Sequence, residues 1–298
     1  MDYPALTLGH REPSKRTLDL VDLTVHVYGL DEIRNSQLPI SVIIASHGRC
    51  NSVKNMHYFA VGLCGELRRL ARAGARAKTH DVLVVTLVRG RADHRNHGAR
   101  LKHRTANLAF DQNPMHLLAP LTPPVGAVQD HQFIIEFLPV YLFPNDERVV
   151  TQWMATGISL GGNTVWRLLA EEPRIRIGVP IIGLPPDSFV KYLSARAVSA
   201  GLKLAPPTFP ASLRPWMEKK AKPGAYDGKK ILTLHGAGDE LVPYRYGQED
   251  IRAVLAAAAE GEVEIWVQDG VGHICSPEML GRTAQWFWRW GLSEPKQA

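Results

Sequence analysis

Short apolar runs alternate with amphipathic segments along most of this 298-residue chain. The runs are rich in β-branched residues and bounded by glycine, proline or polar residues, a pattern typical of buried strands. Between them, apolar residues recur every three or four positions, which predicts helices that each bury one face. We expect strands at 18–28, 40–46, 81–88, 149–154, 177–183, 230–236 and 263–267, and helices at 56–74, 127–142, 165–170, around 251–255 and at 280–290.

This alternation of strands and helices predicts the α/β fold class, with a mostly parallel central sheet flanked by helices on both faces. Right-handed crossovers then gather the loops that follow the strands at one edge of the sheet. We expect a single domain over residues 1–298, because α/β folds of this length commonly form one unit. Residues 89–125 have the pattern of a loop, and the irregular, proline-rich stretch at 184–229 predicts a lid insertion.

Residues 155–163, with the sequence ATGISLGGN, join a predicted strand to a predicted helix. Gly-x-Ser-x-Gly in this setting is typical of a nucleophile elbow, a turn so tight that the positions flanking the serine tolerate almost no side chain. Gly157 and Gly161 meet that demand. The turn would lift the Ser159 hydroxyl above the sheet edge, and the helix N-terminus would aim the Leu160 N–H at the same point. We therefore predict Ser159 as a nucleophile.

A serine hydroxyl needs a histidine base and a carboxylate that orients the histidine, and two later strand ends supply candidates. Asp239 follows the predicted strand at 230–236, with Glu240 as the alternative acid, and His273 follows the strand at 263–267. Nucleophile, acid and histidine then occur in the chain order of the α/β-hydrolase arrangement.

Two backbone N–H groups are also required, to bind the oxyanion of a tetrahedral intermediate. The sequence His47-Gly48-Arg49 ends a predicted strand that would neighbour the elbow strand. We expect the Arg49 N–H to join the Leu160 N–H as the oxyanion hole.

Aromatic residues of the predicted lid are candidates for substrate contact. They are Phe189, Tyr192 and Trp216, and the hydrophobic core is the alternative place for each. His94, His97 and His103 lie close together, but interleaved arginines would repel a cation and no carboxylate or thiolate pattern completes the set. We therefore expect no metal site.

Composition and charge narrow the class of protein. Hydrophobic residues make up 45% and charged residues 21% of the chain, as in ordinary globular proteins. The net charge is +6, and the basic residues are dispersed except for a cluster of lysines within 219–230. We expect this stretch to be a solvated loop. We expect neither nucleic acid nor a membrane as partner. The N-terminus lacks a secretory pattern and the three cysteines lack C-x-x-C spacing, so we expect a cytoplasmic protein with free thiols.

Between residues 40 and 290 the chain resembles the dienelactone-hydrolase-like small serine carboxylesterases of the α/β-hydrolase superfamily. The resemblance rests on Ser46-His47-Gly48, Asp93-x-Arg95-Asn96-His97-Gly98-Ala99-Arg100, Gly157-Ile158-Ser159-Leu160-Gly161-Gly162, His235-Gly236-x-x-Asp239-x-x-Val242-Pro243 and Gly272-His273. It implies Ser159 as nucleophile, Asp239 as acid and His273 as base, with the amides of Arg49 and Leu160 as oxyanion hole. Dienelactone hydrolases place cysteine at the elbow, so the resemblance does not extend to lactone specificity.

We therefore expect a serine hydrolase that cleaves small-molecule carboxylic esters through an acyl-enzyme, without a cofactor. Amides, thioesters and lactones are alternative substrates, because the same triad serves all acyl transfers. A catalytically silent binding protein of the same fold is a further alternative. The sequence leaves the physiological substrate and the oligomeric state open.

Overall fold

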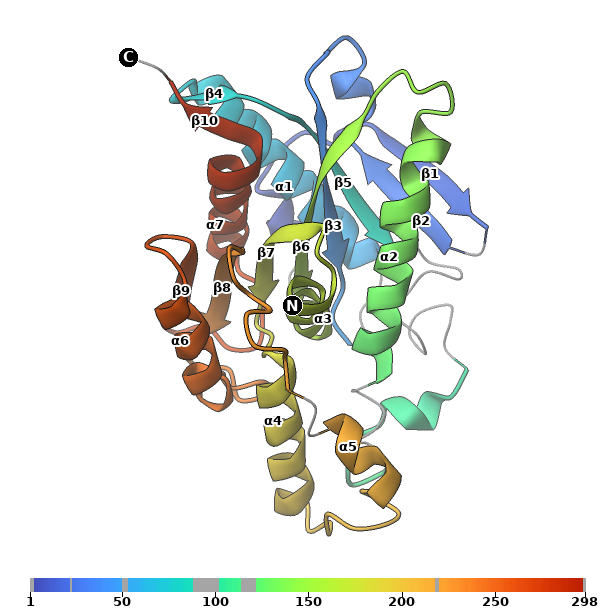
Figure 1. Cartoon of the computed structure of the whole chain (residues 1–298), viewed down its shortest axis with the longest axis vertical. Coiled ribbons are helices and arrows are strands. Elements are labelled where there is room, and N and C mark those ends of the chain that lie inside the picture. Colours follow the sequence, from blue (N-terminus) through green and yellow to red (C-terminus); the bar gives the residue numbers. More distant parts are fainter. Residues whose placement is uncertain are drawn as a thin grey trace.

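The computed structural model describes residues 3–21, 23–49, 53–87, 102–113, 122–217 and 220–296. An eight-stranded sheet with the strand order β1-β2-β5-β3-β6-β7-β8-β9 forms its centre (Figure 1). The strands are β1 (Lys15–Leu20), β2 (Leu23–Tyr28), β3 (Ile40–Ser46), β5 (Asp81–Leu87), β6 (Val150–Ile158), β7 (Ile175–Ile181), β8 (Lys230–Gly236) and β9 (Val263–Gln268). Strand β2 pairs antiparallel with β1 and β5, and the remaining neighbours are parallel.

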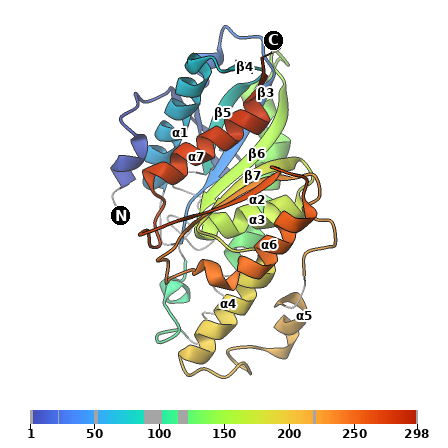
Figure 2. The same cartoon turned by 90° about the vertical axis from the view of Figure 1, so that its left-hand side faces the viewer.

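Helices cover both faces of this sheet, as the alternating pattern predicts (Figure 2). They are α1 (Val53–Ala73), α2 (Thr122–Leu142), α3 (Leu160–Glu171), α6 (Gln248–Ala257) and α7 (Pro277–Phe287). Two further helices, α4 (Pro186–Ser199) and α5 (Arg214–Met217), belong to the segment between β7 and β8. Side chains that alternate along each strand enter two different cores. On β3, Ile43 belongs to the core that includes residues of α1 and α7, whereas Val42 and Ile44 belong to the core that includes residues of α2, α3 and α6.

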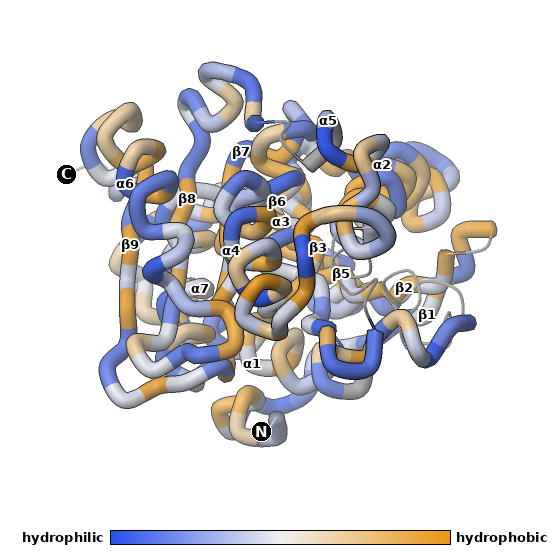
Figure 3. The backbone as a smooth tube through the Cα atoms, turned by 90° about the horizontal axis from the view of Figure 1, so that it is seen from below, coloured by the Kyte–Doolittle hydropathy of each residue, from blue (hydrophilic) through white to orange (hydrophobic). Residues whose placement is uncertain are grey.

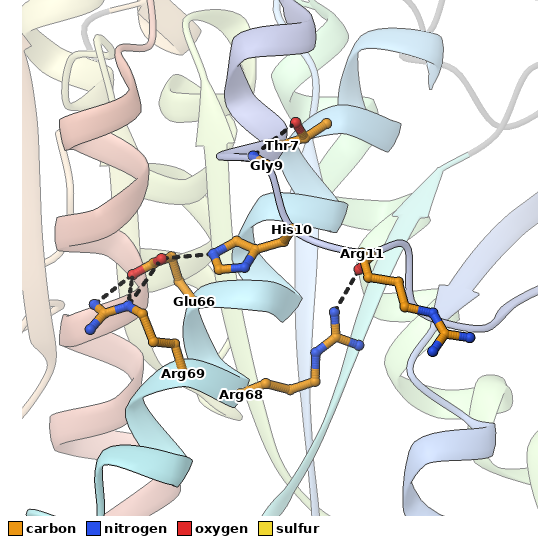
Figure 4. Close-up of polar contacts among 7 residues, drawn as sticks. All are labelled: Thr7, Gly9, His10, Arg11, Glu66, Arg68 and Arg69. Atoms are coloured by element: carbon orange, nitrogen blue, oxygen red, sulfur yellow. Dashed lines mark hydrogen bonds and ion pairs between the residues drawn. The ribbon is translucent and has the colours of Figure 1, made fainter.

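The N-terminal segment crosses the outer face of α1, where two glycines make room for it. A Cβ on Gly62 or Gly65 would overlap with Leu6 or His10. The His10 ring donates to Glu66 Oε1 at 2.8 Å, and Arg69 donates to the same carboxylate, while Arg68 donates to a backbone oxygen of this segment (Figure 4). These contacts tie the segment to α1.

Two expectations about local structure are wrong. Helix α2 begins at Thr122 and includes Pro123 and Pro124, which the sequence suggests to be loop. Proline is tolerated in a first helical turn because the missing N–H would have no partner there. In the lysine cluster, Lys229 is buried and donates to the Ile175 carbonyl oxygen, and Lys230 pairs with Glu262. These two lysines are therefore anchored rather than solvated.

The chain between β7 and β8 leaves the sheet beyond the C-terminal ends of the parallel strands (Figure 1). This excursion coincides with the predicted lid and contains α4 and α5. Seen from below, α4 lies in front of the centre of the sheet, with the largely hydrophobic strands behind it (Figure 3). That residues 184–229 act as a lid stays a prediction.

Strands β4 (Arg76–Lys78) and β10 (Ser293–Pro295) form a separate antiparallel pair. Three residues are too few to show an alternating pattern in the sequence. Within the described ranges, no helix has both the length and the apolar character to cross a bilayer.

Candidate active site

Ser159 is the single residue between the end of β6 and the start of α3. Its backbone has φ 58° and ψ −111°, a conformation that costs free energy in any residue with a side chain. Two bonds hold it: the Ser159 N–H donates to Ile181 O at 2.8 Å, and Ser159 O accepts from the Asn163 N–H at 2.9 Å. The turn is therefore a strained elbow fixed by its neighbours.

Glycines are required on both sides of this elbow because backbones approach each other there. A Cβ on Gly157 would lie 2.5 Å from the carbonyl carbon of Gly161, and a Cβ on Gly161 would overlap with the carbonyl oxygen of Ser46. Neither position has room for a methyl group. The Gly-x-Ser-x-Gly pattern thus has the steric cause that the sequence suggests.

Ser159, His273 and Asp239 form one chain of hydrogen bonds. Ser159 Oγ lies 2.8 Å from His273 Nε2, and His273 Nδ1 lies 2.7 Å from Asp239 Oδ2. Because an ionised carboxylate can only accept, Nδ1 carries the ring proton and Nε2 accepts from the serine hydroxyl. The ends of β6, β8 and β9 thus bring together the three residues singled out in the sequence, whereas Glu240 is exposed.

Asp239 is almost fully buried, and its second oxygen is also satisfied. Oδ1 accepts from the backbone N–H groups of Leu241 at 2.9 Å and Val242 at 2.8 Å. Burial by itself raises the pKa of Asp239, but the hydrogen bonds from His273 and the Val242 N–H lower it by more, so the pKa lies below its ordinary value. The carboxylate is therefore ionised at neutral pH and able to stabilise a protonated His273.

The loop after β3, His47 to Arg49, packs against the elbow and is called here the oxyanion loop. Ser46 pairs with Gly157 in the register of β3 with β6. A Cβ on Gly48 would lie 3.3 Å from the Ser159 Cβ. The His47 ring donates to the Gly48 carbonyl oxygen at 2.8 Å. Because the carbonyl and N–H of a trans peptide point in opposite directions, the Arg49 N–H points away from the His47 ring.

The Leu160 N–H belongs to the first turn of α3, where N–H groups have no partner within the helix. The two backbone amides expected in the sequence thus belong to the loop that packs against the elbow and to the first turn of α3. Their action as an oxyanion hole stays a prediction.

Two of the three predicted pocket residues belong to a third apolar cluster, which includes residues of α4. Phe189 and Tyr192 on α4 are 7% and 2% exposed and pack with Phe110, Leu184 and Val242. The Tyr192 hydroxyl donates to the carbonyl oxygen of Leu241, next to the catalytic carboxylate candidate. Both residues occupy the core, the alternative that the sequence leaves open, and substrate contact by either stays a prediction.

The backbone of Trp216 belongs to α5, and its side chain lies outside the described residues, as do His94 and His97. Among the described side chains, no group of three histidine, cysteine or acidic residues could hold a metal ion. Burial raises the pKa of the Cys64 and Cys275 thiols to about 12, so neither is a nucleophile at neutral pH. Cys50 lies outside the described residues.

His131 on α2 was not singled out in the sequence. It is completely buried and bonded to Ser46, the residue that precedes the oxyanion loop. The signal was present, because His131 lies at helical spacing from Ala127, Ile134 and Ile135 on the buried face of α2. A histidine on such a face needs a polar partner.

No protein-family model matches the chain, and no curated protein matches it either. Solved structures do. TT1662 from Thermus thermophilus has a TM-score of 0.63 and 19% identity, over 93% of this chain and 97% of that one. The Pyrococcus furiosus esterase Pf2001 has a TM-score of 0.51 and 18% identity, over 94% of this chain and 93% of that one. The Pyrococcus horikoshii acylaminoacyl peptidase has a TM-score of 0.58 and 14% identity, over 100% of this chain and 45% of that one. The α/β-hydrolase fold implied by the resemblance is confirmed.

Proposed function

Starting from the α/β-hydrolase fold, we propose that the protein is a serine hydrolase that cleaves carboxylic esters through an acyl-enzyme. The observation that carries this proposal is the pair of hydrogen bonds that links Ser159 through His273 to Asp239, at 2.8 and 2.7 Å. The strained backbone of Ser159 supports it, because strain of this kind gathers at functional sites.

In the first half of the reaction, Ser159 Oγ attacks the carbonyl carbon of the ester while its proton passes to His273 Nε2. Asp239 stabilises the imidazolium and keeps the proton on Nδ1. The carbonyl oxygen becomes an oxyanion, which accepts from the N–H groups of Arg49 and Leu160. As the intermediate collapses, His273 returns the proton to the leaving alkoxide, and the alcohol departs from the acyl-enzyme.

In the second half, a water molecule takes the place of the alcohol. His273 Nε2 removes a proton from this water as its oxygen attacks the acyl carbon, and the same two amides bind the new oxyanion. Collapse of this intermediate breaks the bond to Ser159 Oγ, which recovers its proton from His273. The products are a carboxylic acid and free enzyme, and no cofactor is needed.

Amide hydrolysis is the second candidate, because one similar structure is an acylaminoacyl peptidase. We favour esters on the similarity to Pf2001, an esterase that matches this chain over nearly its full length. Thioesters and lactones would use the same atoms. The intact hydrogen-bond chain favours catalysis over a silent binding role. A small ester as partner and a cytoplasmic location are part of the proposal.

The test is hydrolysis of p-nitrophenyl esters from acetate to decanoate by the wild type and by Ser159→Ala. Loss of a triad nucleophile can cost up to about 10⁶ in turnover, so we expect the variant to show only background. A fluorophosphonate probe should label the wild type and not the variant. Equal activity in both proteins would refute the assignment of Ser159, and hydrolysis of only amides or thioesters would move the proposal to those substrates.

A further inference from the structure

His131 is a buried histidine that the proposed mechanism does not use. It is 0% exposed, and both ring nitrogens have partners, with Nδ1 2.6 Å from Ala127 O and Nε2 2.8 Å from Ser46 Oγ. A carbonyl oxygen can only accept, so Nδ1 carries the proton and Nε2 accepts from the Ser46 hydroxyl. Burial lowers the pKa of His131, which keeps the ring neutral and this arrangement intact.

Ser46 is the last residue of β3, and it contacts the elbow through its backbone. Its carbonyl oxygen lies 2.2 Å from the place that a Cβ on Gly161 would take, and in the sheet register Ser46 stands beside Gly157. The residues that follow are those of the oxyanion loop. The Ser46 side chain therefore ties the junction between elbow and oxyanion loop to α2, on one face of the sheet.

We propose that His131 is a positioning residue for ester hydrolysis, which holds the end of β3 through Ser46 so that the Arg49 N–H meets the oxyanion. This inference rests on the proposed function. Oxyanion donors act mainly on the transition state, where the charge develops, and their effect depends on their placement. Release of Ser46 should therefore lower kcat and leave KM almost unchanged.

The test uses His131→Leu, Ser46→Ala, the double variant S46A/H131L and the conservative His131→Gln. Glutamine keeps an oxygen that can accept from Ser46, whereas leucine does not. Each protein is measured for kcat and KM on p-nitrophenyl butyrate, for its thermal midpoint, and for inhibition by an alkyl trifluoromethyl ketone. The ketone adds to Ser159 as a tetrahedral oxyanion, so its Ki reports the oxyanion hole directly.

Full loss of one donor costs on the order of 10²–10³ in turnover, and we expect displacement of the Arg49 donor to cost about tenfold. His131→Leu and Ser46→Ala should each lower kcat about tenfold, weaken the ketone by the same factor and change KM less than about twofold. His131→Gln should stay within about threefold of the wild type in kcat.

The double variant separates positioning from stability. Removing both polar partners leaves no buried group unsatisfied, so its thermal midpoint should return toward the wild-type value while kcat stays low. Thr283→Ala is a matched control, since Thr283 is a fully buried hydroxyl on α7 that donates to Met279 O at 2.8 Å. It should lower the thermal midpoint and leave kcat and Ki unchanged.

Wild-type kcat and Ki in folded Ser46→Ala would overturn the inference, even where His131→Leu fails to fold. Recovery of kcat together with stability in the double variant would also overturn it. The proposed function fails separately, since the wild type would then show no turnover beyond that of Ser159→Ala in the same assay.

Discussion

Replacing Asp239 by asparagine should reverse the tautomer of His273. The Leu241 and Val242 N–H groups both donate to Oδ1, at 2.9 and 2.8 Å. They require an acceptor at that position, so the amide oxygen of the new side chain would occupy it and the NH₂ group would face His273. This NH₂ group donates to Nδ1, which moves the ring proton to Nε2. Nε2 could then no longer accept from Ser159.

The magnitude follows from the loss of the general base in nearly all molecules. In the trypsin triad the equivalent change lowers kcat about 10⁴-fold with intact geometry, and we expect a similar loss here, about 5.4 kcal/mol of transition-state stabilisation. The assay is kcat on p-nitrophenyl butyrate at pH 7.5, with KM and the thermal midpoint measured on the same samples. KM should change little, because Asp239 lies behind the histidine.

Glu240→Gln is the matched control, because it also changes a carboxylate to an amide, one residue along the chain on an exposed side chain. We expect wild-type kcat from it. A large loss in Glu240→Gln together with an active Asp239→Asn would show that the reasoning about the acid is wrong. An Asp239→Asn protein with kcat within about tenfold of the wild type would refute the tautomer argument, even with Glu240 inert.

Three further results are expected. Gly161→Ala should abolish p-nitrophenyl ester hydrolysis and lower the thermal midpoint, because the new methyl group overlaps with Ser46; retained activity would contradict the geometry of the elbow. Tyr192→Phe removes the bond to Leu241 O and should lower kcat up to about tenfold with little change in KM, whereas a rise in KM alone would indicate substrate contact. Burial lowers the pKa of His235 to about 3, so the unfolded chain binds more protons at its ordinary pKa of 6.5. Stability from this group is thus present above pH 6.5 and lost as the pH falls toward 3, by about 2 kcal/mol between pH 7 and pH 5. Urea unfolding at both pH values should show a smaller loss of stability in His235→Gln than in the wild type. An equal loss would show that His235 is not its source.

The elbow and its two partners could be predicted because each follows a strand of the sheet. Strands β6, β8 and β9 have the apolar runs of a parallel sheet, and parallel strands end at the same edge. That residues beyond those ends lie close together can therefore be predicted without any knowledge of side-chain packing. Spacing alone left Asp239 and Glu240 equivalent, and the structure separates them by burial.

Features that depend on packing between distant segments could not be predicted in the same way. Phe189 and Tyr192 have the composition of a substrate pocket, and only the contacts of α4 with distant residues such as Phe110 and Val242 place them in a core. Lys229 lies in a lysine-rich stretch, but its ammonium group reaches a carbonyl oxygen on β7. The bond between His131 and Ser46 joins residues 85 positions apart, a distance at which no local pattern pairs them.

The bond from Tyr192 to Leu241 has a consequence for the engineering of this chain. It couples the segment between β7 and β8, which is the natural target for exchange when a new substrate range is wanted, to the loop that holds Asp239. A chimaera that replaces residues 184–229 as a block would discard this anchor together with the old binding surface. A graft confined to residues 200–229 keeps the whole of α4 and leaves the anchor in place.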